Sequence, residues 1–289
     1  MRTCERLDGW QWRLCALSAC TFALASGCDT DGSAKDDVIV DGQAGRLHVE
    51  ASGEGGLPVV FLHSFGGNTT HWAEQMERLD GSRKVIAIDL RGHGESDAPA
   101  PPDYRVESLA SDVEVAVDAL LPAERFVLVG HSMGGATAVA YADANAARVA
   151  GLVLLGTPGK SPAAMAEQVL ASLQADYEGG MASYTDRLLE SAKPEVANRI
   201  RAEMQKIPRE ESLAIIAAVF AYDPLPALQR YTGPTLIVDT PHGEGPTALH
   251  TQLPDIPREV ISGTSHWPHL DKPKEFDAIL EGFLDRVSE

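Results

Sequence analysis

The stretch FVLVGHSMGGA, residues 126–136, decides how the rest of the sequence is interpreted. Four apolar residues typical of a buried strand lead directly into a Gly-x-Ser-x-Gly pentapeptide, and a helix-forming stretch follows from Ala136 to Val149. Glycines on both sides of the serine let a strand and a helix approach closely. This sequence of strand, tight turn and helix is the arrangement that presents a serine hydroxyl as a nucleophile. We therefore predict that Ser132 is such a nucleophile.

Short apolar runs recur along the chain, with helix-compatible stretches between them. This alternation is typical of an α/β fold with a mostly parallel central sheet flanked by helices. The final helix begins near Pro273 and carries its apolar residues on one stripe. The predicted strands comprise an opening antiparallel pair at residues 38–40 and 45–51, followed by Val59–Leu62, Val85–Ile88, Phe126–Val129, Leu152–Leu155, Thr235–Val238 and Glu259–Ile261.

A long segment between the predicted strands at 152–155 and 235–238 has no strand pattern. It is too long for a loop inside a compact domain. We therefore predict a helical lid at about residues 158–228, inserted into a single domain that spans residues 38–289. Four amphipathic helices are expected in it, at residues 162–173, 181–191, 194–206 and 209–220.

The N-terminal segment has the pattern of a targeting signal. Three arginines precede an apolar run, Leu14–Leu24, which is too short to span a bilayer but typical of a signal-peptide core. The run ends in Ala-Ser-Gly-Cys28, which resembles the lipobox of bacterial lipoproteins. The resemblance implies a signal peptide at residues 1–27, acylation of Cys28 and a tether at residues 28–37. The alternatives are an ordinary signal peptide cleaved near Ala25 and a misassigned start codon.

Composition and charge exclude several classes of function. Hydrophobic residues are 44% and charged residues 23% of the chain, which excludes a disordered or collagen-like protein. A net charge of −18 argues against a nucleic-acid partner, because phosphate binding needs a basic surface. No cysteine follows Cys28, so the folded body has neither a disulfide framework nor a cysteine nucleophile. His266 and His269 form no His-Glu-x-x-His motif, and we expect no metal.

Four segments between about residues 45 and 287 resemble the α/β-hydrolase superfamily, in its lid-bearing esterase and lactonase-like branch. One departure is Ser64, where the family usually has glycine. The segments are LHSFGG at 62–67, DLRGHGES at 89–96, GHSMG at 130–134 and GTSHWP at 263–268. The resemblance implies an α/β-hydrolase fold.

The same resemblance implies roles for individual residues. Ser132 matches the nucleophile and His266 the general base, while the backbone N–H groups of Met133 and Phe65 match the oxyanion hole. The chemistry of serine catalysis requires the same pair of groups. An unactivated hydroxyl is a weak nucleophile, so an imidazole must take its proton. A carboxylate must in turn orient that imidazole.

The orienting carboxylate is harder to assign. The resemblance places it just beyond the strand at 235–238, but the family's usual Gly-x-x-Asp pattern is absent from DTPHGEGP, residues 239–246. Asp239 directly adjoins the strand. Glu244 lies further on, between two glycines, and has the longer reach. We favour Glu244, with Asp239 as the alternative and a dyad without an acid as the third possibility.

These residues imply a carboxylesterase-like serine hydrolase that cleaves ester-like bonds of a small or medium organic substrate through an acyl-enzyme, without metal or organic cofactor. Carbon–carbon bond hydrolases, lactonases and perhydrolases of the family use the same apparatus. Epoxide hydrolases and haloalkane dehalogenases use aspartate as nucleophile, which Ser132 disfavours. A catalytically silent binding module is the alternative from another class. The lipobox further implies a location in the bacterial cell envelope, facing the periplasm or the exterior, with the lipid anchor as the only membrane contact.

Overall fold

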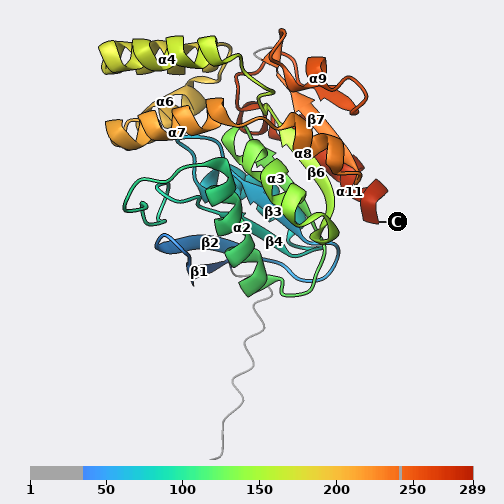
Figure 1. Cartoon of the computed structure of the whole chain (residues 1–289). Coiled ribbons are helices and arrows are strands. Elements are labelled where there is room, and N and C mark those ends of the chain that lie inside the picture. The colour runs from blue at the N-terminus through green and yellow to red at the C-terminus, as the bar shows by residue number, and fades with distance from the viewer. Residues whose placement is uncertain (1–34, 241–242, 289) are drawn as a thin grey trace, which may run out of the picture. The chain divides into compact units, whose positions relative to one another are not determined.

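The computed structural model describes residues 35–240 and 243–288 (Figure 1). Within them, one eight-stranded sheet has the order β1-β2-β4-β3-β5-β6-β7-β8. β2 runs antiparallel to β1 and β4, and all other neighbours are parallel. The predicted α/β-hydrolase fold class is confirmed. The strands are β1 (Asp36–Asp41), β2 (Arg46–Ser52), β3 (Val59–Leu62), β4 (Val85–Ile88), β5 (Phe126–His131), β6 (Val149–Leu155), β7 (Thr235–Asp239) and β8 (Arg258–Val260).

Helices cover both faces of the sheet because its central strands are apolar on both sides. In β3, Val60 and Leu62 pack into one hydrophobic cluster, and Val59 and Phe61 pack into the other. α2 (Val106–Leu120), α3 (Met133–Ala144) and α8 (Leu225–Arg230) lie on the first face (Figure 1). The second face carries η1 (Thr69–Trp72), α1 (Ala73–Leu79) and α11 (Pro273–Ser288). Three short helices complete the body, η2 (Ala146–Arg148), α9 (Leu249–Gln252) and α10 (Pro268–Asp271).

The segment between β6 and β7 is helical, and Figure 1 shows α4, α6 and α7 at one end of the sheet, whereas α8 lies on its face. α5 begins at Tyr177 rather than at Met181, because the Asp176 carboxylate caps it by accepting the Gly179 N–H at 3.0 Å. α8 was not predicted. The lid helices are α4 (Ala163–Ala175), α5 (Tyr177–Leu188), α6 (Pro194–Met204) and α7 (Arg209–Ala221).

The N-terminal predictions lie mostly outside the described residues, and these include the signal peptide at 1–27 and Cys28. The end of the predicted tether, however, is already part of the sheet. β1 begins at Asp36, which pairs with Ala51 of β2. Among the described residues, no helix is long and apolar enough to cross a membrane.

Candidate active site

Ser132 lies at a strained turn between β5 and α3. Its φ of 53° and ψ of −111° place it in a region that side-chain-bearing residues rarely adopt, and such strain is often found at functional sites. The flanking glycines explain how the turn is closed. A Cβ on Gly130 would lie 2.3 Å from the Gly134 carbonyl oxygen, and one on Gly134 would lie 2.4 Å from the Leu62 carbonyl oxygen. The strand–turn–helix arrangement predicted from the sequence is therefore present.

The helix α3 begins directly after this turn. Met133 is the first helical residue, so its N–H has no acceptor within the helix. The first hydrogen bonds of the helix are those that Gly135 and Ala136 donate to the Ser132 carbonyl, at 2.9 Å and 3.1 Å. Helix N-termini carry partial positive charge and favour a developing negative charge nearby. The role of the Met133 N–H as an oxyanion donor stays a prediction, and its place at the N-terminus of α3 is compatible with it.

The loop that carries Phe65 is held by a buried histidine. His63 Nδ1 donates to the Ser64 carbonyl at 2.8 Å, and His63 Nε2 accepts the Leu90 N–H at 2.9 Å. Because Nε2 is an acceptor, the ring is neutral, and burial lowers the pKa of His63 well below its usual value. Phe65 is buried and meets the His93 ring edge-on, with 6.1 Å between ring centroids. His63 therefore holds the loop that carries Phe65.

His266 lies in the loop between β8 and α10. Its N–H donates to the Leu188 carbonyl at 2.9 Å, and its carbonyl accepts His131 Nε2 at 2.8 Å. The imidazole lies beside Gly156, where a Cβ would be 3.0 Å from its Cε1 and 3.3 Å from its Nδ1. A side chain at position 156 would therefore displace the ring.

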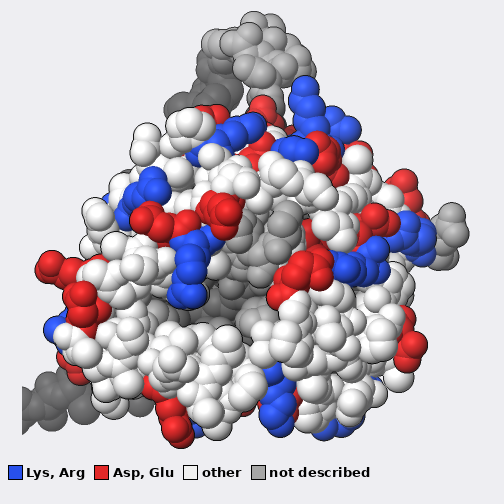
Figure 2. Space-filling model, turned by 90° about the horizontal axis from the view of Figure 1, so that it is seen from above, with Lys and Arg blue, Asp and Glu red and all other residues white. Residues whose placement is uncertain are grey.

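Ser132 and His266 line the same cavity, which has a volume of about 200 Å³. Tyr184 and Leu188 of α5, with Val219 and Phe220 of α7, supply an apolar roof from the lid. Figure 2 shows the molecule from the lid side, where the surface is hollowed near its centre and side chains of both charges lie around the hollow. The structure therefore places the predicted nucleophile and the predicted base on the wall of one cavity.

The two candidate acids differ in exposure. The Glu244 side chain lines the same cavity, is 59% exposed, and accepts a hydrogen bond from Arg258 Nη2 at 2.5 Å. The Asp239 side chain is 3% exposed, and its Oδ2 lies 2.9 Å from Arg258 Nε and 2.6 Å from His250 Nδ1. The hydrogen bond from Arg258 holds the pKa of Glu244 below its usual value, whereas burial raises the pKa of Asp239.

Sequence reasoning missed Arg258 and His250, the two basic residues of this cluster. Arg258 opens β8 and His250 lies on the short helix α9, and neither belongs to a motif. Only the tertiary fold brings them to the end of β7. His269, which follows His266 by three residues, is buried instead in the core and stacks on Trp72 with 4.4 Å between ring centroids. Burial lowers the pKa of His269 well below its usual value, so it is a neutral packing residue.

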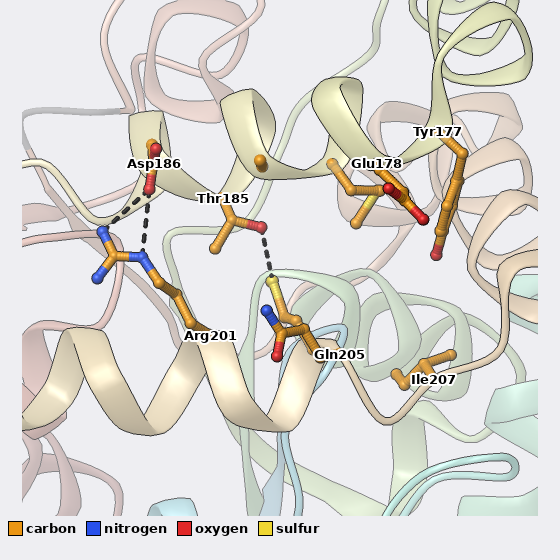
Figure 3. Close-up of a pocket in the computed structure, with 10 residues that line it drawn as sticks. Tyr177, Glu178, Thr185, Asp186, Arg201, Gln205 and Ile207 are labelled. Atoms are coloured by element: carbon orange, nitrogen blue, oxygen red, sulfur yellow. Dashed lines mark hydrogen bonds and ion pairs between the residues drawn. The ribbon is translucent and has the colours of Figure 1, made fainter.

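A larger cavity of about 560 Å³ lies between α5 and α6 (Figure 3). The Thr185 hydroxyl donates to Met204 Sδ at 3.2 Å, and Arg201 pairs with Asp186 at 2.9 Å within this cavity. All of its lining residues belong to the lid segment. The smaller cavity, and not the larger one, is lined by Ser132 and His266.

Comparisons with known proteins agree with this fold. A family model described as alpha/beta hydrolase fold matches residues 58–191. Epoxide hydrolase 3 of Xenopus tropicalis is 28% identical in an alignment 309 residues long. The alignment covers 93% of this chain and 81% of that protein.

Two solved structures extend the similarity over most of the chain. Est816, described as an N-acyl homoserine lactone degrading enzyme, has a TM-score of 0.76 at 28% identity and covers 85% of this chain and 100% of its own. A thermophilic esterase from Thermogutta terrifontis has a TM-score of 0.75 at 26% identity. The match covers 88% of this chain and 100% of the esterase chain. The chain is therefore an α/β-hydrolase-fold protein, similar to esterases, lactone-degrading enzymes and epoxide hydrolases.

Proposed function

We propose that the protein is a serine hydrolase that cleaves an ester-like bond, with Ser132 as the nucleophile and His266 as the general base. One observation carries the proposal: the strained Ser132 turn and the His266 imidazole line one cavity beneath the lid. A positioned imidazole is what a serine hydroxyl needs in order to attack a carbonyl carbon at neutral pH.

The reaction has two halves. Ser132 Oγ bonds to the substrate carbonyl carbon while His266 takes the hydroxyl proton, and the tetrahedral oxyanion accepts the N–H groups of Met133 and Phe65. The oxyanion collapses, the alcohol leaves with the proton from His266, and an acyl-enzyme remains. Water, deprotonated by His266, then attacks the acyl carbon, and Ser132 is released with its proton restored.

The size of the cavity supports a small or medium substrate. The volume of about 200 Å³ lies below the roughly 300–1,000 Å³ of typical ligand pockets. The similarity to a lactone-degrading enzyme and to an esterase is compatible with this, because a lactone is a cyclic ester. Epoxide opening is not proposed, despite the similarity to epoxide hydrolase 3, because that class uses an aspartate nucleophile and position 132 is serine.

A fluorophosphonate probe tests the nucleophile directly. We expect the folded wild type to be labelled at one site and Ser132→Ala to remain unlabelled, because the probe reacts only with an activated hydroxyl. Ser161→Ala is the matched control, since Ser161 lines the same cavity and its loss leaves labelling intact. A folded wild type that takes no label would contradict the proposal and favour a binding module.

The proposal also includes a lipid anchor at Cys28, which lies outside the described residues. The acyl chains add about 0.8 kcal/mol of membrane affinity for each buried methylene, so two or more chains retain the protein firmly. In a Gram-negative host we expect wild type in the detergent phase of a phase-partition experiment and Cys28→Ser in the aqueous phase. Cys20→Ser, within the predicted signal peptide, should behave as wild type. Wild-type protein found wholly in the aqueous phase would exclude the anchor.

A further inference from the structure

One buried carboxylate, that of Asp271, joins the histidine loop to the lid. Asp271 is the last residue of α10 and is 2% exposed. Its Oδ2 accepts the N–H and the hydroxyl of Ser265, at 2.7 Å and 2.6 Å, and Ser265 directly precedes His266. Its Oδ1 accepts the N–H of Lys193 at 2.9 Å, and Lys193 directly precedes the lid helix α6. Three donors from two separate segments therefore converge on one side chain.

A second bond joins the same two segments. The N–H of His266 itself donates to the carbonyl of Leu188, the last residue of α5, at 2.9 Å. The lid turn from Leu188 to Lys193 is thus held at both of its ends by the loop that carries His266. A change in the position of this turn is transmitted to the backbone on both sides of the imidazole.

The network continues to the oxyanion loop. The Ser265 hydroxyl, oriented by its bond to Asp271, accepts the Trp267 N–H at 3.1 Å. The Trp267 indole N–H then donates to the Ser64 hydroxyl at 3.2 Å, beside Phe65. Ser64 stands where the family usually has glycine, so its hydroxyl supplies a link that a glycine lacks. Asp271 therefore lies at the junction of the lid, the histidine loop and the oxyanion loop.

We infer that Asp271 is a positioning residue that fixes His266 relative to Ser132 and makes this geometry depend on where the lid lies. The inference rests on the proposed function. A buried carboxylate held by three hydrogen bonds is a strong and directional anchor. Displacement of a reacting group by about 1 Å can cost about 10²-fold in rate, so an anchor of this kind controls turnover without touching substrate.

Asp271→Asn tests the inference with little change in volume. The amide nitrogen cannot accept a hydrogen bond, so at least one of the three donors is left opposite another donor. We expect kcat to fall by about 10- to 10²-fold with KM nearly unchanged, because the cavity that binds substrate is intact. Asp277→Asn is the matched control. Asp277 is a part-buried aspartate that accepts Gln75 Nε2 at 2.8 Å, away from the loop, and kcat should stay at the wild-type value.

A backbone substitution separates the lid contact from the loop contact. Lys193 has a φ of −61°, which proline adopts without strain, and proline has no N–H to donate. Lys193→Pro therefore removes the bond from the lid to Asp271 and leaves both bonds to Ser265. We expect it to lower kcat by a few-fold, whereas Lys193→Ala keeps the N–H and the wild-type kcat.

Amide hydrogen exchange gives a measurement that does not depend on ester turnover. Asp271→Asn should speed exchange both in residues 265–267 and in the lid turn 188–193, whereas Asp277→Asn should change neither. If kcat falls equally in the two variants, or if exchange in the lid turn does not change, the inference is overturned. If wild type hydrolyses no ester, the proposed function fails, and the exchange data alone decide whether Asp271 couples the two segments.

Discussion

Replacing His266 by alanine is expected to lower kcat for a nitrophenyl ester by at least about 10³-fold while the protein remains folded. Without the imidazole, no base takes the Ser132 proton, and residues that act as a unit in catalysis lose most of the rate when one is removed. His266 lies in a loop at the cavity wall, beside Gly156, so its removal enlarges the cavity and leaves the sheet and its two hydrophobic clusters unchanged.

The control for this experiment is the neighbouring buried histidine. His269→Phe keeps a ring stacked on Trp72 and removes two nitrogens that have no hydrogen-bond partner among the described residues. Its kcat should stay within a few-fold of wild type. Steady-state kinetics of both variants, with folding checked by circular dichroism, distinguish the two residues. A large loss in His269→Phe and a small one in His266→Ala would mean that the base has been assigned to the wrong residue.

Much of the fold could be predicted from local sequence patterns, namely runs of apolar residues and the spacing of glycines. Val59–Leu62 and Val85–Ile88 are predicted as strands and observed with the same bounds, because four consecutive apolar residues fit only a position buried on both faces. The Ser132 turn was predictable for a related reason. Glycine spacing around the serine reports directly on how closely a strand, a turn and a helix pack.

Features that depend on distant segments could not be predicted. The start of α5 was missed because Gly179 and Gly180 disfavour a helix locally, while the Asp176 cap and the packing of the lid stabilise it. In the sequence, nothing distinguishes Asp271 from other acidic residues near the start of a helix. Its role follows only from the hydrogen bonds that Ser265 and Lys193 donate to it. Hydrogen bonds of this kind join residues far apart in the chain, and neither composition nor periodicity reports on them.

The orienting acid gives the last and largest expected effect: Glu244→Gln should lower kcat by about 10⁴-fold, as the loss of such a carboxylate does when the imidazole loses its correct tautomer. Glu244 is favoured because it lines the cavity with Ser132 and His266. Arg258 and His250 contact both carboxylates, so the place at the cavity, where Glu244 is a lining residue and Asp239 is not, distinguishes the two candidates.

Asp239→Asn should therefore act mainly on stability, with unfolding easier by about 1–3 kcal/mol, because the partly buried Arg258 and His250 lose a charged acceptor that is itself buried. Glu259→Gln is the matched control for removing one acidic charge from the same edge of the sheet, since Glu259 is exposed on β8 and should be silent in both measurements.

Kinetics and denaturant unfolding of the three variants decide among the assignments. If only Asp239→Asn loses activity, Asp239 is the acid and Arg258 and His250 hold it in place. If none of the three loses activity, Ser132 and His266 work as a dyad, and Arg258 serves to neutralise the two carboxylates at the end of β7.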